Sequence, residues 1–173
     1  MNQISRRNIS RLILLILLQV LIFKQLNIGS VQFNYIQVII YPLFLMLLPI
    51  GIGKGWLLIV SFAVGLAIDM FYDSPGVHAS ASVLTGFIRP FVLQLMEPRG
   101  GYKVNAIPTK AEFGDNWFLR YASLLLIAHL LIYFSMEVFT LTELDYILLK
   151  TFFTFLPSML LIIIYMYILN PRF

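Results

Sequence analysis

Long apolar runs alternate with short polar connections along this chain of 173 residues. Several of these runs are close to the ~20 residues that an α-helix needs to cross ~30 Å of hydrocarbon. The pattern predicts an all-α membrane protein with six transmembrane helices, forming a single transmembrane domain over residues 1–173. The expected helices cover about 10–26, 35–50, 55–72, 77–96, 117–139 and 146–168.

Three details modify this picture. Pro42 lies inside the second expected helix and predicts a kink there, because proline removes a backbone hydrogen-bond donor. The polar stretch 97–116 mixes glycine, proline and both signs of charge, which is typical of a surface loop. The first apolar run follows Arg6, Arg7 and Arg11 without a small-residue cleavage site, so we expect a helix there and not a signal peptide.

The composition excludes a soluble domain. Hydrophobic residues make up 60% of the chain, charged residues 12%, and the mean hydropathy is +0.90. Cysteine is absent, which leaves no disulfide, thiolate metal site or cysteine nucleophile. His78 and His129 share no metal-ligand spacing, and no phosphate-binding loop, nucleophile elbow or zinc-protease pattern is present. We therefore expect no enzyme, no metal and no cofactor, and the net charge of +4 indicates no nucleic-acid partner.

The basic residues sort to alternate connections, as the cytoplasmic excess of Lys and Arg in membrane proteins requires. With a cytoplasmic N-terminus, nine of the twelve fall on or beside that side: Arg6, Arg7, Arg11, Lys54, Arg99, Lys103, Lys110, Arg120 and Arg172. Lys24 and Lys150 fall near the outer side. The sorting predicts six crossings with both termini cytoplasmic. The charges of loop 97–116 could dock a cytoplasmic partner or anionic lipid headgroups, or simply orient the helices.

Four ionisable residues fall at or near membrane depth: Asp69, Asp73, His78 and Arg89, the last directly before Pro90. A charge there costs about 2.5–3.5 kcal/mol on insertion scales, so each needs a partner or a polar cavity. One interpretation is a proton relay or substrate site, and the other is a charge-paired latch between the third and fourth helices. Four groups near one surface are too few for a convincing relay, which favours the latch. We expect His129 to be a satisfied interior histidine and Glu137 to reach the outer surface.

The run GLAIDMFYDSPGVHASASVLTGFIRPFVL, from Gly65 to Leu93, resembles the signature region of the rod shape-determining MreD family. That family has a Gly-x-x-x-Asp near the end of its third helix, a short Gly-containing turn, and a helix rich in Ala and Ser. The matching positions are Gly65, Asp69, Gly76, Ala79, Ala81 and Ser82. Arg89-Pro90, residues 98–102 around Arg99 and the Asn170-Pro171-Arg172 ending resemble one branch of the family.

The resemblance implies a non-catalytic scaffold of the wall-elongation machinery in a bacterial inner membrane. Its expected partners are MreC, and through MreC the polymerase RodA, its transpeptidase and MreB filaments, in addition to membrane lipids. The implied fold is similar to the six-helix S component of energy-coupling-factor transporters. An S component that captures a vitamin or metal is the alternative function. It would need polar groups converging below the outer surface, and the last helix offers few of them.

Overall fold

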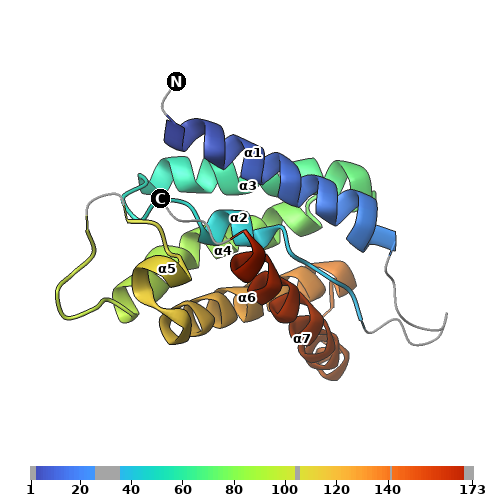
Figure 1. Ribbon diagram of the computed structural model, residues 1–173. Helices are drawn as coiled ribbons and strands as arrows, with labels where there is room; N and C mark the ends of the chain where they lie inside the picture. Colours follow the sequence, from blue (N-terminus) through green and yellow to red (C-terminus); the bar gives the residue numbers. More distant parts are fainter. Residues whose placement is uncertain (1–2, 26–35, 104–105, 141, 170–173) are drawn as a thin grey trace.

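The computed structural model describes residues 3–25, 36–103, 106–140 and 142–169, and for residues 3–7 it describes the backbone alone. Over these residues the chain is helical and contains no β-strand (Figure 1). The elements in chain order are α1 (Gln3–Leu17), a π-helical turn η1 (Leu18–Ile22), a 3-10 turn η2 (Phe23–Gln25), α2 (Pro42–Met46), α3 (Lys54–Tyr72), α4 (Val77–Leu95), α5 (Lys110–Phe113), α6 (Asp115–Val138) and α7 (Leu144–Ile168).

Four of the described helical stretches are long and apolar enough to cross a membrane: Asn8–Gln25, Lys54–Tyr72, Asp115–Val138 and Leu144–Ile168. The helix α4 has 19 residues, and 19 residues extend about 28 Å at the helical rise. Its alanines, serines, histidine and arginine make it less apolar than the other four. The all-α prediction is confirmed, and the four apolar helices are compatible with a membrane protein.

Five of the six expected helices match observed ones within a few residues, apart from the start of the first. The expected helix 10–26 corresponds to α1 with η1 and η2, and it begins earlier, at Gln3. The other four correspond to α3, α4, α6 and α7. The expected surface loop 97–116 contains the single turn α5. It is partly buried at Ala106, Ile107 and Thr109, and the Ala106 carbonyl accepts a backbone hydrogen bond from Ile50 at 2.9 Å.

The second expected helix, 35–50, is wrong over most of its length. Residue 35 lies outside the described residues, and only Pro42–Met46 is α-helical; residues 37–40 and 47–53 form turns and irregular backbone. Pro42 occupies the first turn of α2, where its missing N–H is not needed. It therefore begins a short helix and does not kink a long one. Pro49 and Gly51 follow soon afterwards, and both residue types favour turns.

This interrupted segment runs through the middle of the bundle, and every residue from Val38 to Leu48 is buried. Irregular backbone at membrane depth is tolerated only where other groups satisfy its N–H and C=O. The side-chain amide of Gln19, which is 1% exposed, supplies both kinds of partner. Its Nε2 donates to the Val38 carbonyl at 2.9 Å, and its Oε1 accepts from the Ile40 amide at 2.8 Å.

Two hydroxyl groups of α7 satisfy the alternate amides of the same segment. The Ser158 hydroxyl accepts from the Ile39 amide at 2.9 Å, and the Thr154 hydroxyl accepts from the Gln37 amide at 3.2 Å. Single polar residues in otherwise apolar helices thus replace the backbone bonds that a continuous helix would have made.

The helices α3 and α4 approach each other closely at two glycines, Gly65 of α3 and Gly86 of α4. A Cβ atom added to Gly65 would lie 2.5 Å from the Cα of Ala79 and from the carbonyl oxygen of His78. One added to Gly86 would overlap the side chain of Ser61. Small residues at such positions let membrane helices approach closely, so these two glycines set the distance between α3 and α4.

We expect Gly65→Ala to lower the free energy of unfolding by about 1–3 kcal/mol, because overpacking of this size forces the backbone to shift. Thermal unfolding of the detergent-solubilised variant measures the loss. Gly55→Ala is the matched control, since a Cβ at Gly55 meets nothing within 4 Å. Equal melting temperatures for the two variants would contradict the close contact.

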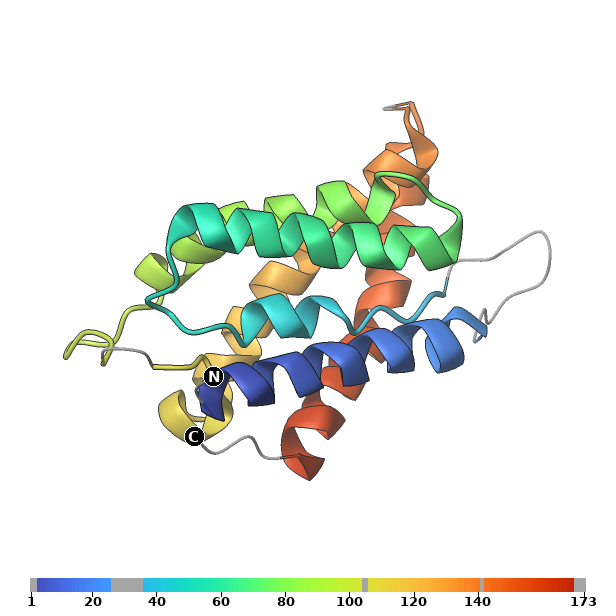
Figure 2. The same ribbon diagram turned by 90° about the horizontal axis from the view of Figure 1, so that it is seen from above.

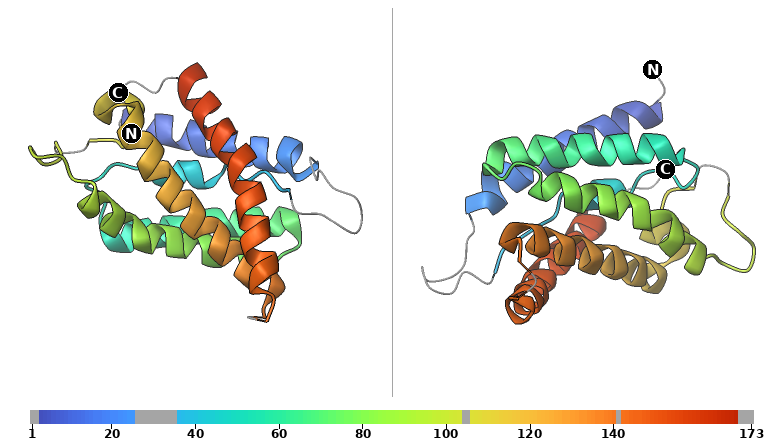
Figure 3. Two further views of the ribbon diagram at one scale, coloured as in Figure 1. Left: turned by 90° about the horizontal axis from the view of Figure 1, so that it is seen from below. Right: turned by 180° about the vertical axis from the view of Figure 1, so that it is seen from behind.

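The helices follow one another in a connected bundle, with α3 packed on α4, α4 on α6 and α6 on α7 (Figure 3), while α2 contacts α1, α4 and α6. In Figure 2, α1, α3 and α6 begin on the side of the molecule where α4 ends. That side carries Lys54 and the basic residues of the connection from α4 to α6. Lys24, by contrast, donates to the Phe71 carbonyl near the far end of α3.

Candidate functional site

The Asp69 carboxylate forms the N-terminal cap of the next helix. Asp69 is 3% exposed. Its Oδ1 accepts from the His78 amide at 2.9 Å and from the Ser74 hydroxyl at 3.2 Å, and its Oδ2 accepts from the Gly76 and Ala79 amides at 3.0 Å each. The first amides of a helix lack intrahelical partners and carry partial positive charge. A carboxylate from α3 therefore satisfies the start of α4 and joins the two helices.

The turn between α3 and α4 depends on two left-handed residues. Asp73 has φ 52° and ends α3, and Gly76 has φ 90° and precedes α4. Aspartate tolerates this conformation better than most residues, and glycine adopts it freely. The Asp73 side chain is exposed and does not join the Asp69 cluster, although it lies only four residues away.

The Arg89 guanidinium lies at the end of α2 and is 1% exposed. Its Nε donates to the Tyr121 hydroxyl at 2.9 Å, and one terminal nitrogen donates to the Leu48 carbonyl and, at 3.4 Å, to the Pro49 carbonyl. The Tyr121 hydroxyl in turn donates to the Met46 carbonyl at 2.9 Å. Tyr121 therefore binds the last carbonyl of α2, and Arg89 binds the carbonyls of the turn that follows α2.

The expected charge-paired latch takes a different form. Asp69 and Arg89 do not pair with each other, since each is held by backbone groups of a neighbouring segment. Asp69 ties α3 to α4, and Arg89 ties α4 to the segment after α2 and, through Tyr121, to α6. Pro90 lies inside α4, which continues beyond it to Leu95.

A chain of four buried side chains begins and ends on α4, passing through Tyr41 of the central segment and His129 of α6. Thr85 Oγ1 donates to the Ala81 carbonyl at 2.8 Å, so it must accept from His129 Nδ1, also at 2.8 Å. With its proton on Nδ1, neutral His129 accepts at Nε2 from the Tyr41 hydroxyl at 2.9 Å. The Tyr41 oxygen then accepts from His78 Nδ1 at 3.1 Å. With both rings neutral, matching each donor to an acceptor along the chain thus assigns the tautomers of both histidines.

This assignment leaves His78 Nε2 as a bare acceptor, and among the described residues it has no hydrogen-bond partner. The imidazole packs against the rings of Tyr72 and Tyr133, each with its centroid at 4.7 Å. The other end of the chain is a backbone carbonyl inside α4. These four side chains therefore do not lead from one face of the protein to the other, which weighs against the proton-relay interpretation. His129 is a satisfied interior histidine, as expected.

We expect Tyr41→Phe to lower the free energy of unfolding by about 1–3 kcal/mol, because it strands a buried donor on His78 and a buried acceptor on His129. Denaturant titration of the purified protein measures the difference. Tyr167→Phe is the control, because that ring is 59% exposed. A loss no larger than the control's would contradict the tautomer chain.

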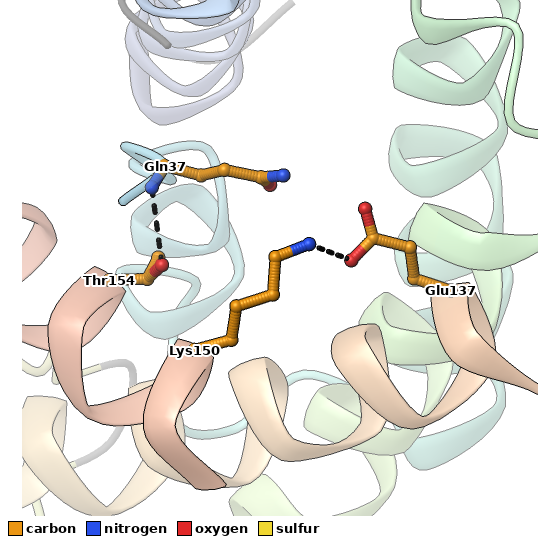
Figure 4. A network of polar contacts seen from close by, with 4 residues as sticks. All are labelled: Gln37, Glu137, Lys150 and Thr154. Atoms are coloured by element: carbon orange, nitrogen blue, oxygen red, sulfur yellow. Dashed lines mark hydrogen bonds and ion pairs between the residues drawn. The ribbon is translucent and has the colours of Figure 1, made fainter. Parts of the chain in front are cut away.

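A further buried charge, Lys150 of α7, lies near the C-terminal end of α6. Lys150 is 5% exposed, and its Nζ lies 2.7 Å from Oε2 of Glu137, whose side chain is 33% exposed (Figure 4). The same ammonium lies 5.0 Å from the ring centroid of Phe134 and 5.3 Å from that of Tyr146. Glu137 is an exposed residue, and its carboxylate neutralises the buried ammonium of Lys150.

The remaining candidate residues lie apart from these clusters. Arg99 and Lys54 are exposed, Lys103 pairs with Glu112 at 3.2 Å, and Lys110 lies 3.0 Å from the ring centroid of Tyr167. Arg11 is 8% exposed, so it packs within the protein in addition to flanking an apolar run. The side chains of Arg6 and Arg7 and the whole of Arg172 lie outside the described residues.

The loop after α4 is fastened by aromatic side chains. The Tyr102 hydroxyl donates to the Leu93 carbonyl at 2.7 Å, and Trp117 Nε1 donates to the Met96 carbonyl at 2.8 Å. Burial, with the negative charge of Glu97 as a second cause, raises the pKa of Tyr102 to about 12. The phenol therefore remains a hydrogen-bond donor throughout the physiological range of pH.

Sequence reasoning missed Gln19, Tyr41, Thr85 and Tyr121 as members of the polar interior. Gln19 carries the clearest signal, because it is an uncharged polar residue in the middle of an apolar run. Tyrosine and threonine occur in membrane helices without such a role, so their positions give no comparable sign. Among the described residues, no group of three His, Cys, Asp or Glu could hold a metal ion.

The chain matches no known protein family, no curated protein and no solved structure.

Proposed function

We propose that this chain is a non-catalytic scaffold of the bacterial wall-elongation machinery, an MreD-like protein of the inner membrane. One observation carries the proposal. Three residues of the MreD-like pattern have a structural role: Gly65 admits the backbone of α4, Asp69 caps it, and Gly76 turns the chain into it. These residues hold α3 and α4 at a fixed spacing, which is what a scaffold requires of its helices.

We further propose six crossings with both termini cytoplasmic. Four helices are long and apolar enough to span a membrane, and α4 has the length. The buried segment around α2 supplies the sixth crossing, since its irregular backbone is enclosed by protein, where such backbone is tolerated. Both termini and most of the basic residues then share one side.

Labelling of single cysteines tests this topology without background, because the chain contains no cysteine. We expect Lys54→Cys, at the start of α3, to react with a membrane-impermeant maleimide only after the cells are opened. Pro75→Cys, in the exposed turn between α3 and α4, should react in cells whose inner membrane is intact. The reverse pattern, or reaction of both in intact cells, would contradict the six crossings.

The alternative function, an S component that captures a vitamin or metal, finds less support. Such a protein needs unpaired polar groups that converge on a ligand. The buried charges that the structure describes are engaged within the protein: Asp69 by amides of α4, Arg89 by carbonyls near α2, and Lys150 by Glu137. These contacts stabilise packing, which favours a scaffold.

The proposed direct partner is MreC, a single-span protein, with RodA, its transpeptidase and MreB connected through it. Co-expression of the tagged chain with MreC from the same organism, followed by capture in mild detergent, tests this pairing. We expect a complex that survives size exclusion. A tagged S component from the same organism is the control and should retain no MreC. A folded chain that also retains none would contradict the proposal.

A further inference from the structure

An open groove of about 890 Å³ lies between the C-terminal end of α4 and the first turns of α6. Its lining includes Leu95, Glu97, Asn116, Leu119, Arg120 and Leu124. Trp117, also at the groove, fastens its two walls through the hydrogen bond to Met96. The groove is therefore a built feature of the fold, separate from the buried polar network described above.

Polarity changes along the groove in the way that it changes across a membrane surface. Asn116 and Arg120 belong to the first turns of α6, and Leu124 lies about one turn beyond Arg120. The rise from residue 116 to residue 124 is about 12 Å, enough to pass from headgroup level into hydrocarbon. Trp117, beside the polar end, is a residue type enriched at membrane interfaces. Leu95 and Leu124 remain 79% and 44% exposed, as expected for side chains in contact with acyl chains.

Two opposite charges stand at the polar end of the groove. Glu97 follows α4, Arg120 belongs to α6, and both are exposed. Within the described part of the chain, neither forms an ion pair. A ligand that contacts both must carry a negative and a positive group, together with an apolar tail for the rest of the groove. Arginine binds phosphate well because its fork of donors matches phosphate oxygens.

We propose that this groove binds an aminophospholipid such as phosphatidylethanolamine. The lipid phosphate contacts Arg120 and the amide of Asn116, the primary ammonium contacts Glu97, and an acyl chain lies along Leu95 and Leu124. Glu97 disfavours a purely anionic headgroup. A quaternary ammonium has no N–H to donate to the carboxylate, so phosphatidylcholine fits less well than phosphatidylethanolamine.

Native mass spectrometry of the purified full-length chain tests the proposal. The chain is mixed with equal amounts of phosphatidylethanolamine, phosphatidylglycerol and phosphatidylcholine that carry identical acyl chains. We expect at least fivefold more retained phosphatidylethanolamine than either competitor. Glu97→Gln should abolish this preference, and Arg120→Gln should lower retention of all three lipids. Asp73→Asn and Arg99→Gln, which change exposed charges outside the groove lining, should leave retention unchanged.

A second variant separates lipid binding from folding. Leu124→Trp fills the apolar end of the groove from an exposed position, and we expect it to reduce retention without changing the elution volume of the protein. Equal retention of the three lipids, or unchanged retention in the Glu97 and Arg120 variants, would overturn the proposal. So would cross-linking from Leu124→Cys to a co-purified protein in place of lipid. The measurement uses the isolated chain, so its outcome is independent of whether MreC is the partner.

Discussion

We expect Asp69→Ala to lower the free energy of unfolding by about 2–4 kcal/mol, more than an ordinary lost helix cap. The carboxylate accepts from three backbone amides and one hydroxyl at the start of α4. Alanine leaves the amides of the buried residues His78 and Ala79 without this partner. It also removes a buried negative charge at this helix N-terminus, where a negative charge is favourable. Denaturant titration in detergent, with loss of helical ellipticity as the signal, measures the change.

The matched control for Asp69 is Asp73→Asn. Asp73 lies in the same turn and is exposed, and asparagine also tolerates its left-handed backbone. We expect this control to change stability by less than about 0.5 kcal/mol. Asp69→Asn is informative as a third variant, because it retains one acceptor oxygen and should lie between the other two. If Asp69→Ala and Asp73→Asn unfold at the same denaturant concentration, the capping account is wrong.

Arg89→Ala should be the more damaging of the two substitutions, with a loss of about 3–5 kcal/mol from the emptied volume and the stranded polar groups together. The Tyr121 hydroxyl loses its donor, and the carbonyls of Leu48 and Pro49 lose theirs. The turn after α2 then has no side-chain donor for these carbonyls. We therefore expect the central segment to loosen first, which hydrogen exchange of residues 38–48 would detect as faster exchange.

Two further variants separate the charge of Arg89 from its shape. Arg89→Lys keeps the charge but lacks the fork that reaches Tyr121 and the carbonyls together, so we expect it to recover only part of the stability. Arg99→Ala removes an exposed arginine of the following loop and should be neutral. A fully stable Arg89→Lys would mean that charge alone suffices, and a fully stable Arg89→Ala would remove the role of Arg89 in binding the carbonyls after α2.

The helices were largely predictable from the sequence, and the central segment was not. Apolar runs of the correct length identify α3, α4, α6 and α7, because a helix long enough to cross a membrane is predominantly apolar. The residues around α2 are equally apolar, but they are buried on all sides, so no periodicity separates a helix from irregular backbone. What decides between the two is the set of partners at Gln19, Thr154 and Ser158, which lie on other helices.

The candidate site was likewise predictable from the sequence only in part. Asp69, Gly76 and His78 could be grouped from the sequence because they are neighbours along the chain, and the structure does bring them together. The partners of Asp69 and Arg89 could not be found, because they are backbone amides and carbonyls, which every residue carries. The sequence therefore suggested a charge-paired latch, whereas Asp69 and Arg89 are each bound by backbone groups of a neighbouring segment.

The capped helices also bear on how a scaffold could work. Each cap joins elements that are consecutive or nearly so in the chain, from α3 to α4 and from α4 to α2 and α6. Because these caps lie inside the protein, the exposed apolar side chains of α3, α4 and α7 take no part in them. Those outer faces are then available to a partner helix without cost to the internal contacts.

Affinity purification of the tagged full-length chain from native membranes, followed by identification of every co-purified protein, tests the scaffold proposal most directly. The proposal predicts recovery of a single-span coiled-coil protein of the MreC type, with or without wall-synthesis enzymes. Recovery of a transport ATPase pair together with a bound small molecule would contradict it, and would assign the chain to substrate capture instead.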